Sequence, residues 1–267
     1  MDFQYLKLEF KAQVATIWLN RPELHNAFNS TVIEELHACL EHLQDRDDVR
    51  VVILAGRGKS FSAGADLNWM KQAGMASTEE NQADALKLAQ MLQRLATLKH
   101  PTIARVHGLA LGGGMGLAAA CDICIASDNA QFATSEVRLG LAPSTISPYV
   151  IRAIGVRQAS RYFLTAERIS VIQAHAIGLV HERSTMDQLD STVQKIVQSL
   201  LMGGPQAQAA SKQLIAMVEA ETIDATLIHK TAQHIAEVRQ GDEAKAGLTA
   251  FLNKHSPTWI KTTAEQE

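Results

Sequence analysis

Apolar residues recur along the N-terminal half of the chain with the spacings that distinguish strands from helices. Residues 5–10 and 14–19 have the pattern of two short strands, with a hairpin turn at residues 11–13. Thr31 and Glu34 then give a capping-box signal for the start of a helix. The apolar residues of that helix follow three or four positions apart: Ile33, Leu36, Leu40 and Leu43. We therefore expect a β-hairpin followed by an amphipathic helix.

The continuous apolar run at residues 51–55 predicts a strand that is covered on both faces, and residues 102–106 predict another strand of the buried type. A long helix is expected between these two strands at residues 78–98, and the proline at position 101 marks its end. A further strand is expected at residues 122–126. Strands that alternate with helices form a mostly parallel sheet with right-handed crossovers, so the pattern predicts an α/β fold.

The pattern changes in the C-terminal part of the chain. From residue 148 to residue 255 it predicts one helix after another with few strands. Gly203-Gly204-Pro205 is the clearest break in this part. We therefore divide the chain into a core at residues 1–200 and a helical region at residues 201–267, and expect the helical region to mediate oligomerisation.

Composition narrows the class of protein. The 267 residues suit one domain with a helical appendage, and the net charge of −3 argues against nucleic-acid binding, which usually needs a basic face. No apolar run approaches the roughly 18 residues of a membrane span, and the first residues lack the pattern of a signal or mitochondrial targeting segment. Three cysteines do not make a disulfide framework. We expect a cytoplasmic protein without nucleic-acid or membrane partners.

Two short motifs resemble sites of other protein classes but are incomplete. Cys121 and Cys124 have the spacing of half a zinc site, yet the sequence offers no second pair of ligands. Gly58-Lys59-Ser60 matches the end of a phosphate-binding loop, but Ile53 stands where that motif needs a glycine. We therefore predict no metal, and keep Lys59 as a candidate contact for a ligand phosphate.

A glycine cluster followed by a lone acid is the candidate site. The glycines are Gly108, Gly112, Gly113, Gly114 and Gly116. Glycine lets a backbone approach a ligand closely, and the free N–H groups at the start of a helix bind anionic oxygen atoms. Glu136 follows among apolar residues, where a carboxyl group has a raised pKa and can transfer protons near neutral pH. An ion pair with Arg138 or a helix cap would explain Glu136 equally well. Beside a glycine-lined pocket, it is a candidate acid/base.

These residues belong to a longer series of motifs that resembles the crotonase, or enoyl-CoA hydratase/isomerase, superfamily over almost the whole chain. The motifs stand at residues 19–22, 26–28, 61–67, 108–114 and 120–123, and at Glu136 with Leu139-Gly140. The resemblance implies a spiral of ββα units with a helical C-terminal trimerisation region. The expected assembly is a homotrimer, or a hexamer built as a dimer of trimers.

The resemblance also implies an acyl-CoA substrate and assigns roles to residues. The thioester oxygen is expected between the backbone N–H groups of Ala65 and Gly113, which would stabilise an enolate, and Glu136 matches the family's later glutamate. Coenzyme A enters as part of the substrate, so no separate cofactor is expected. The remaining expected substrate or CoA contacts are His25, Ala27, Lys59, Ala63, Asp66, Leu67, Gly112 and Gly116, with Phe251 and Lys254 reaching the CoA of a neighbouring subunit.

One position departs from the family pattern. Typical hydratases carry two glutamates, and Gly116 stands where the first is expected. A single later glutamate also occurs among the family's double-bond isomerases. Against that, three segments resemble bacterial methylglutaconyl-CoA hydratases, whose substrates are branched and carboxylated: residues 61–70, 135–150 and 161–170. Gly116 is then expected to leave room for the distal carboxylate, with Arg138 or Arg152 as its partner.

We therefore predict an enoyl-CoA hydratase in which Glu136 activates water for addition at Cβ while Ala65 and Gly113 hold the enolate. The main alternative is a Δ3,Δ2-enoyl-CoA isomerase that uses Glu136 to move one proton between carbons. A non-catalytic RNA-binding or scaffold protein is a hypothesis from a different class, since some relatives of methylglutaconyl-CoA hydratases bind RNA. The net charge of −3 weighs against it.

Overall fold

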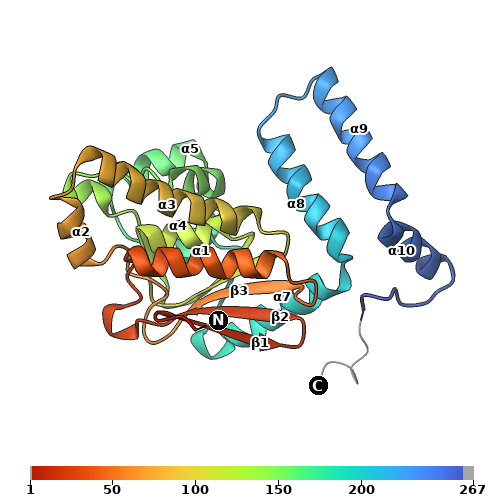
Figure 1. The fold of residues 1–267 in the computed structure, drawn as a ribbon, viewed down its shortest axis with the longest axis horizontal. Coiled ribbons are helices and arrows are strands. Elements are labelled where there is room, and N and C mark those ends of the chain that lie inside the picture. The colour runs from red at the N-terminus through yellow and green to blue at the C-terminus, as the bar shows by residue number, and fades with distance from the viewer. Residues whose placement is uncertain (1, 261–267) are drawn as a thin grey trace.

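The computed structural model describes residues 2–260, and its centre is a six-stranded sheet (Figure 1). The strands run in the order β1-β2-β3-β4-β6-β9. The first two pair antiparallel, as the predicted hairpin requires, and all later neighbours in this sheet pair parallel. The α/β fold with a mostly parallel sheet is therefore confirmed. The bounds are β1 (Leu6–Lys11), β2 (Val14–Leu19), β3 (Val51–Gly56), β4 (Thr102–Val106), β6 (Ile123–Ser127) and β9 (Glu182–Ser184).

A second sheet of three strands was not expected from the sequence. It contains β5 (Leu109–Leu111), β7 (Gln131–Ala133) and β8 (Ile169–Ser170). The glycine-rich pattern around β5 hides this strand, because three residues between glycines are too few for a recognisable alternation. The short strands β5 and β7 lead to α4 (Gly113–Ala120) and to the 3-10 helix η2 (Glu136–Leu139), so this small sheet carries the candidate site.

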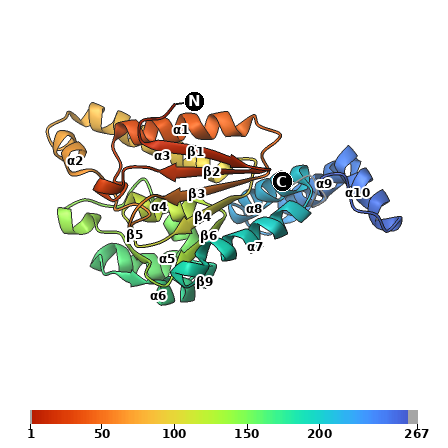
Figure 2. The same cartoon turned by 90° about the horizontal axis from the view of Figure 1, so that it is seen from below.

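Helices of the same chain cover both faces of the large sheet (Figure 2). On β3, Val52 and Leu54 pack into the core on one face, whereas Val51, Ile53 and Ala55 pack with α7 on the other. Every residue of β3 and β4 is consequently buried, which explains the continuous apolar run of β3. The helices of the first face include α1 (Ser30–Gln44), α3 (Thr78–Thr97) and α4, and α7 spans Leu189–Met202.

The start of α1 differs from the expected capping box. The helix begins at Ser30, and the side chain of Asn29 accepts a hydrogen bond from the Val32 N–H at 2.9 Å. Thr31 therefore lies inside the first turn, and Glu34 forms an ion pair with Lys87 of α3. The expected box is wrong because an asparagine two residues earlier is an equally good cap. The remaining elements of the core are η1 (Pro22–Leu24), α2 (Leu67–Ala73), α5 (Ser147–Thr165), α6 (Val171–Ala176) and η3 (Met186–Gln188).

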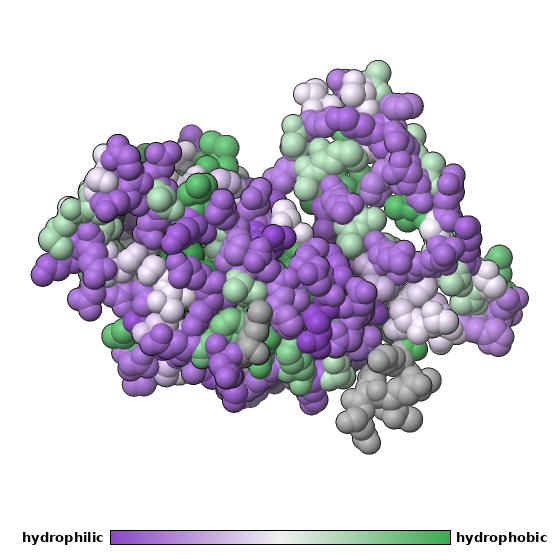
Figure 3. All heavy atoms as spheres, in the orientation of Figure 1, coloured by the Kyte–Doolittle hydropathy of each residue, from purple (hydrophilic) through white to green (hydrophobic). Residues whose placement is uncertain are grey.

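After α7 the chain leaves the core and forms three helices that project from it (Figures 1 and 2). We call these helices the arm: α8 (Pro205–Glu219), α9 (Ala225–Gln240) and α10 (Asp242–Leu252). The arm's helices contain a single buried residue, Leu227. Apolar side chains consequently reach the surface of the arm (Figure 3).

The cysteines are buried side chains of the core. Cys39, Cys121 and Cys124 are all free thiols, and burial raises the pKa of each. Their setting fits small core residues rather than reactive thiols. Within residues 2–260, no group of three or more His, Cys, Asp or Glu side chains is arranged to hold a metal ion. No helix in that range has the length and apolar character needed to cross a membrane.

Candidate active site

The start of α4 is one side of the candidate site. Gly112 adopts φ 49° and ψ −120°, a conformation that favours glycine, and its N–H donates to the Ala133 oxygen of the neighbouring strand β7 at 2.8 Å. Gly113 is the first residue of the helix, so its N–H has no acceptor within the helix. The backbone geometry therefore provides an N–H group for a ligand at Gly113.

The loop that carries Ala65 runs alongside β5. The Ser62 N–H donates to the Leu109 oxygen, and the Leu111 N–H donates to the Ser62 oxygen, both at 2.9 Å. Gly64 then approaches the end of β5 so closely that an added Cβ would lie 3.1 Å from the Leu111 oxygen and 3.9 Å from the Gly112 Cα. The peptide of Gly64 and Ala65 consequently lies beside Gly112 and Gly113.

Phe28 links both halves of this backbone pair. Its N–H donates to the Gly64 oxygen and its oxygen accepts from the Asp66 N–H, each at 2.7 Å. In a parallel bridge this pattern turns the N–H of the residue between, Ala65, away from Phe28. The Phe28 ring packs against Gly113, where an added Cβ would lie 2.3 Å from its Cε2 atom. The sequence indicates Phe28 only as part of a family motif, because no pattern of neighbouring residues predicts either of these two contacts.

Glu136 completes the site from η2. Its Oε1 atom lies 3.1 Å from the position that a Cβ on Gly112 would take, so only a glycine fits there without displacing the carboxyl group. Its Oε2 atom is buried without a hydrogen-bond partner, and burial raises the pKa of the side chain. No ion pair joins Glu136 to Arg138 among the described residues, which removes that alternative explanation. A half-buried carboxyl group with one unpartnered oxygen can move a proton, and backbone N–H groups beside it can hold an anionic oxygen.

Gly116 does not border open space. A Cβ at this position would lie 2.2 Å from Cγ2 and 2.7 Å from Cβ of Ile146, and both residues are buried. The expectation that Gly116 leaves room for a substrate carboxylate is therefore wrong, because Ile146 fills that room. Of its two expected partners, Arg138 is exposed, whereas Arg152 lies 3.6 Å from Glu219 of the arm in an ion pair.

Most of the expected CoA contacts lie in two adjoining loops. The Ala63 N–H donates to the His25 oxygen at 2.9 Å, and Nδ1 of His25 lies 3.1 Å from the Ser60 hydroxyl. His25, Lys59 and Leu67 are exposed, while Ala27 is buried. The structure thus brings the loops together and leaves three side chains open to a ligand.

Asp66 has a structural role in these loops. Its carboxylate pairs with Arg21 at 2.9 Å, and both side chains are almost fully buried. It also caps α2 by accepting from the N–H groups of Asn68 and Trp69. Burial alone would raise the pKa of Asp66, but these hydrogen bonds hold it below its ordinary value. A substrate could therefore reach its backbone more easily than its carboxylate.

The two expected C-terminal contacts lie on the arm. Phe251 stands near the end of α10 with 80% of its surface exposed, and Lys254 follows just beyond it with φ 58°. In both ribbon views α10 is far from α4 (Figures 1 and 2). The end of α10 therefore lies well away from the start of α4 in the same chain.

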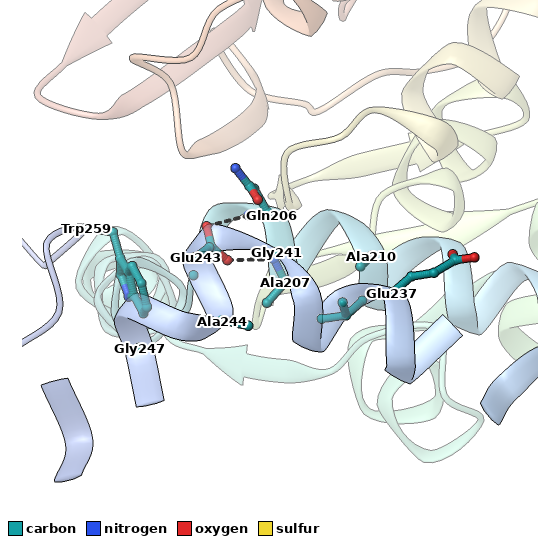
Figure 4. Close-up of a pocket in the computed structure, with 11 residues that line it drawn as sticks. Gln206, Ala207, Ala210, Glu237, Gly241, Glu243, Ala244, Gly247 and Trp259 are labelled. Carbon is teal, nitrogen blue, oxygen red and sulfur yellow. Dashed lines mark hydrogen bonds between the residues drawn. The ribbon is translucent and has the colours of Figure 1, made fainter. Parts of the chain in front are cut away.

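A separate cavity of about 340 Å³ lies within the arm, between α8, α9 and α10 (Figure 4). Small side chains line much of it, and Trp259 closes one end. Glu243 of α10 caps α8 there by accepting from the N–H groups of Gln206 and Ala207 at 2.9 and 2.8 Å. This cavity is distant from Glu136 and contains none of the expected site residues.

The mostly parallel α/β fold, the glycine-rich start of α4 and the carboxyl group of Glu136 point to one class of enzyme. The enoyl-CoA hydratase/isomerase family model matches residues 9–262, so the chain belongs to that family of enzymes and has the crotonase fold, with its spiral of ββα units and helical C-terminal region. The short-chain-enoyl-CoA hydratase of Clostridium acetobutylicum is 34% identical over 256 residues, which cover 95% of this chain and 97% of that protein. The crotonyl-CoA hydratase of Syntrophomonas wolfei is 32% identical over 263 residues, covering 97% and 99%.

Solved structures of similar proteins have the same fold. A crystal structure of an enoyl-CoA hydratase from Shewanella pealeana superposes with a TM-score of 0.94 at 41% identity, covering 97% of each chain. Pseudomonas aeruginosa AtuE superposes with a TM-score of 0.92 at 34% identity, covering 97% of this chain and all of that one. Neither comparison identifies the acyl group that this chain accepts.

Proposed function

We propose that the protein is an enoyl-CoA hydratase in which Glu136 is the acid/base and the N–H groups of Ala65 and Gly113 form the oxyanion hole. The observation that carries this proposal is the half-buried carboxyl group of Glu136, with its Oε2 atom buried and unpartnered, beside the start of α4. Relatives named as hydratases of enoyl-CoA or crotonyl-CoA support it at more than 30% identity.

The reaction follows from the charges at this site. The Glu136 carboxylate takes a proton from water as the hydroxyl oxygen bonds to Cβ of the 2-enoyl thioester. The electron pair of the double bond moves toward the thioester, whose oxygen becomes anionic between the two N–H groups. Protonated Glu136 then returns its proton to Cα, which gives the 3-hydroxyacyl-CoA product. One backbone donor of this kind is typically worth about 3–4 kcal/mol in the transition state.

An isomerase is the second candidate, and the packing of Gly116 favours it. Ile146 occupies the space that the side chain of a second acid at position 116 would need. Glu136 is therefore the one acid that we propose for the proton transfer. A single carboxylate suffices to take a proton from C2 of a 3-enoyl thioester and return it at C4. The same oxyanion hole would stabilise the intermediate.

One spectroscopic assay separates the two activities. With crotonyl-CoA, a hydratase lowers the absorbance of the conjugated enoyl thioester as water adds. With a 3-enoyl-CoA, an isomerase raises that absorbance. We expect the decrease with crotonyl-CoA; an increase with the 3-enoyl substrate and no change with crotonyl-CoA would identify the isomerase instead.

The finer parts of the proposal concern substrate, assembly and location. We propose a branched or carboxylated, methylglutaconyl-type substrate on the three similar segments of sequence, although Ile146 removes the room first expected for its distal carboxylate. A comparison of the turnover of methylglutaconyl-CoA with that of crotonyl-CoA tests this substrate proposal.

We also propose a cytoplasmic homotrimer or hexamer. The arm exposes apolar side chains that a neighbouring subunit could cover.

RNA binding has no comparable support. The net charge of −3 weighs against the basic face that nucleic acids usually require. We expect no gel shift with RNA at physiological salt, and tight binding there would revive this hypothesis.

A further inference from the structure

The loop after β3 carries two cationic side chains that differ in their partners. Arg57 pairs with Glu9 at 2.8 Å, and its guanidinium lies over the Trp18 ring at 3.8 Å from the centroid. Lys59 is exposed, and no ion pair joins it to a carboxylate within the described part of the chain. Lys59 is therefore the cation of this loop that is available to a phosphate group.

The backbone on both sides of Lys59 is held by the two residues that precede β5. Nε2 of His107 lies 2.9 Å from the Gly58 oxygen, so a hydrogen bond fixes the peptide that leads into Lys59. The Lys59 oxygen packs against Gly108, where an added Cβ would collide with it. The Phe61 N–H donates to the His107 oxygen at 2.9 Å, which anchors the end of the same loop. The side chain of Lys59 thus extends into solvent from a fixed backbone.

The contacts of His107 determine which of its ring nitrogens carries the proton. Nδ1 lies 3.3 Å from Nη1 of Arg105, and a guanidinium has donors only, so Nδ1 accepts. Nε2 then carries the proton and donates it to the Gly58 oxygen. Arg105 is itself held by Asp190 of α7 at 2.5 Å. Burial lowers the pKa of His107, and the charge of Arg105 lowers it further, so the ring is neutral at pH 7.

We propose that His107 is a positioning residue for the CoA part of the substrate: through the Gly58 oxygen it orients the loop so that the ammonium group of Lys59 meets a phosphate group of CoA. His107 does not touch the substrate, because it is only 4% exposed. This inference rests on the proposed acyl-CoA function and concerns the nucleotide end of the substrate, not its acyl group.

His107→Asn is the direct test. The shorter amide takes the place of Nδ1 and keeps an acceptor for Arg105, but it does not reach the Gly58 oxygen. We expect KM for crotonyl-CoA to rise about fivefold with little change in kcat, which is the size expected for the loss of one exposed ion pair. His107→Gln extends the amide toward Gly58 and should restore KM.

Crotonyl-pantetheine separates positioning from a general loss of structure. This thioester has the same acyl group and lacks the phosphate groups of CoA. Its kcat/KM should be the same for His107→Asn as for the wild type, and an equal loss with both thioesters would overturn the proposal.

His100→Asn is the matched control. His100 is also a buried histidine, and its Nε2 atom lies 3.0 Å from the backbone oxygen of Leu43, at the opposite end of β4 from His107. The same change there should leave KM for both thioesters unchanged.

A cycle of single and double variants tests whether His107 acts through Lys59. Lys59→Gln should raise KM for crotonyl-CoA by about the same factor as His107→Asn, because either change removes the same contact with a phosphate group. Adding His107→Asn to Lys59→Gln should then raise KM little further. Additive effects would show that His107 acts by another route, which would overturn the proposal.

The outcomes separate the inference from the function on which it rests. If His107→Asn does not fold, His107→Phe fills the space without a donor and should give the same rise in KM. If the wild-type protein turns over enoyl-CoA but KM responds to neither Lys59→Gln nor the His107 variants, the role of His107 is refuted and the proposed function stands. If the wild-type protein neither binds nor converts any acyl-CoA, the proposed function fails and the inference fails with it.

Discussion

The core and the arm differ in how much of their apolar surface is buried within the chain. In the core, β3 and β4 are buried along their whole length because helices of the same chain cover both faces. In the arm, α8 and α10 have no buried residue and α9 has one, Leu227. The core is complete in one chain, whereas the arm exposes the surface that a folded helix normally hides.

The same division separates two kinds of functional residue. Glu136, Ala65 and Gly113 belong to the core, where backbone contacts fix them. Phe251 lies on the arm with 80% of its surface exposed, Lys254 follows it, and both are proposed to contact the CoA of a neighbouring subunit. The comparison predicts that core variants change the chemical step and leave the assembly intact, and that arm variants do the reverse.

The largest effect is expected for Glu136→Gln. The amide cannot take a proton from water, so kcat for crotonyl-CoA should fall by about 10³–10⁴-fold. Calorimetry should show nearly unchanged binding of a saturated acyl-CoA, and sedimentation an unchanged assembly. Glu182→Gln, at an exposed glutamate of the edge strand β9, is the control. Near-normal turnover of Glu136→Gln would remove this residue from the mechanism.

Ala65→Pro should have the next largest effect. Proline deletes the N–H that is proposed to hold the enolate oxygen, and loss of one such donor costs about 10²–10³ in kcat. Ala65→Gly keeps the N–H and controls for loss of the methyl group. A circular dichroism spectrum and a melting curve that match those of the wild type will show that Ala65→Pro is folded, so that the two kcat values can be compared. Retained activity in a folded Ala65→Pro protein would contradict the assignment of this donor.

In the arm, Leu248→Asp combined with Leu252→Asp should weaken the assembly and spare the fold. These side chains are 58% and 77% exposed and lie four residues apart on one face of α10. Burial of a leucine is worth about 1.5–3 kcal/mol, so the subunit dissociation constant should rise at least tenfold. Sedimentation over a dilution series measures this.

Lys245→Gln, on the same helix, controls for a change in surface charge. If the double variant and the wild type sediment identically at every concentration, α10 is not an interface. A raised KM with unchanged kcat in the dissociated protein would link Phe251 and Lys254 to the CoA of a neighbouring subunit.

The sequence predicted those features of the core that depend on local patterns. The apolar run at residues 51–55 and the buried-type pattern at residues 102–106 predicted β3 and β4, and the glycines with Glu136 predicted the candidate site. It could not show that Phe28 touches Gly113 or that Ile146 covers Gly116, because these partners are 85 and 30 positions apart and ordinary core residues at both places look alike. The capping box at Thr31 failed for a related reason, since several residues near a helix start can cap it and only the folded backbone selects one.

The smallest expected effect is on the stability of the core. Burial raises the pKa of Glu136 in the folded protein above its value in the unfolded chain. At low pH both states are protonated and the side chain contributes nothing. As pH rises past the unfolded value, the unfolded chain loses its proton first, so the free energy of unfolding falls until the raised folded pKa is passed.

Glutamine does not ionise, so Glu136→Gln should be more stable than the wild type at neutral pH, and the gain should vanish in acid. Because the carboxyl group is partly accessible to solvent, we expect about 1 kcal/mol, or roughly 2–4 °C in melting temperature. Melting curves from pH 4 to pH 8 measure the difference. The leucine variants of the arm should not change with pH in this way, because they do not alter a buried carboxyl group. A gain for Glu136→Gln that is constant over the whole range would mean that burial does not raise the pKa of Glu136.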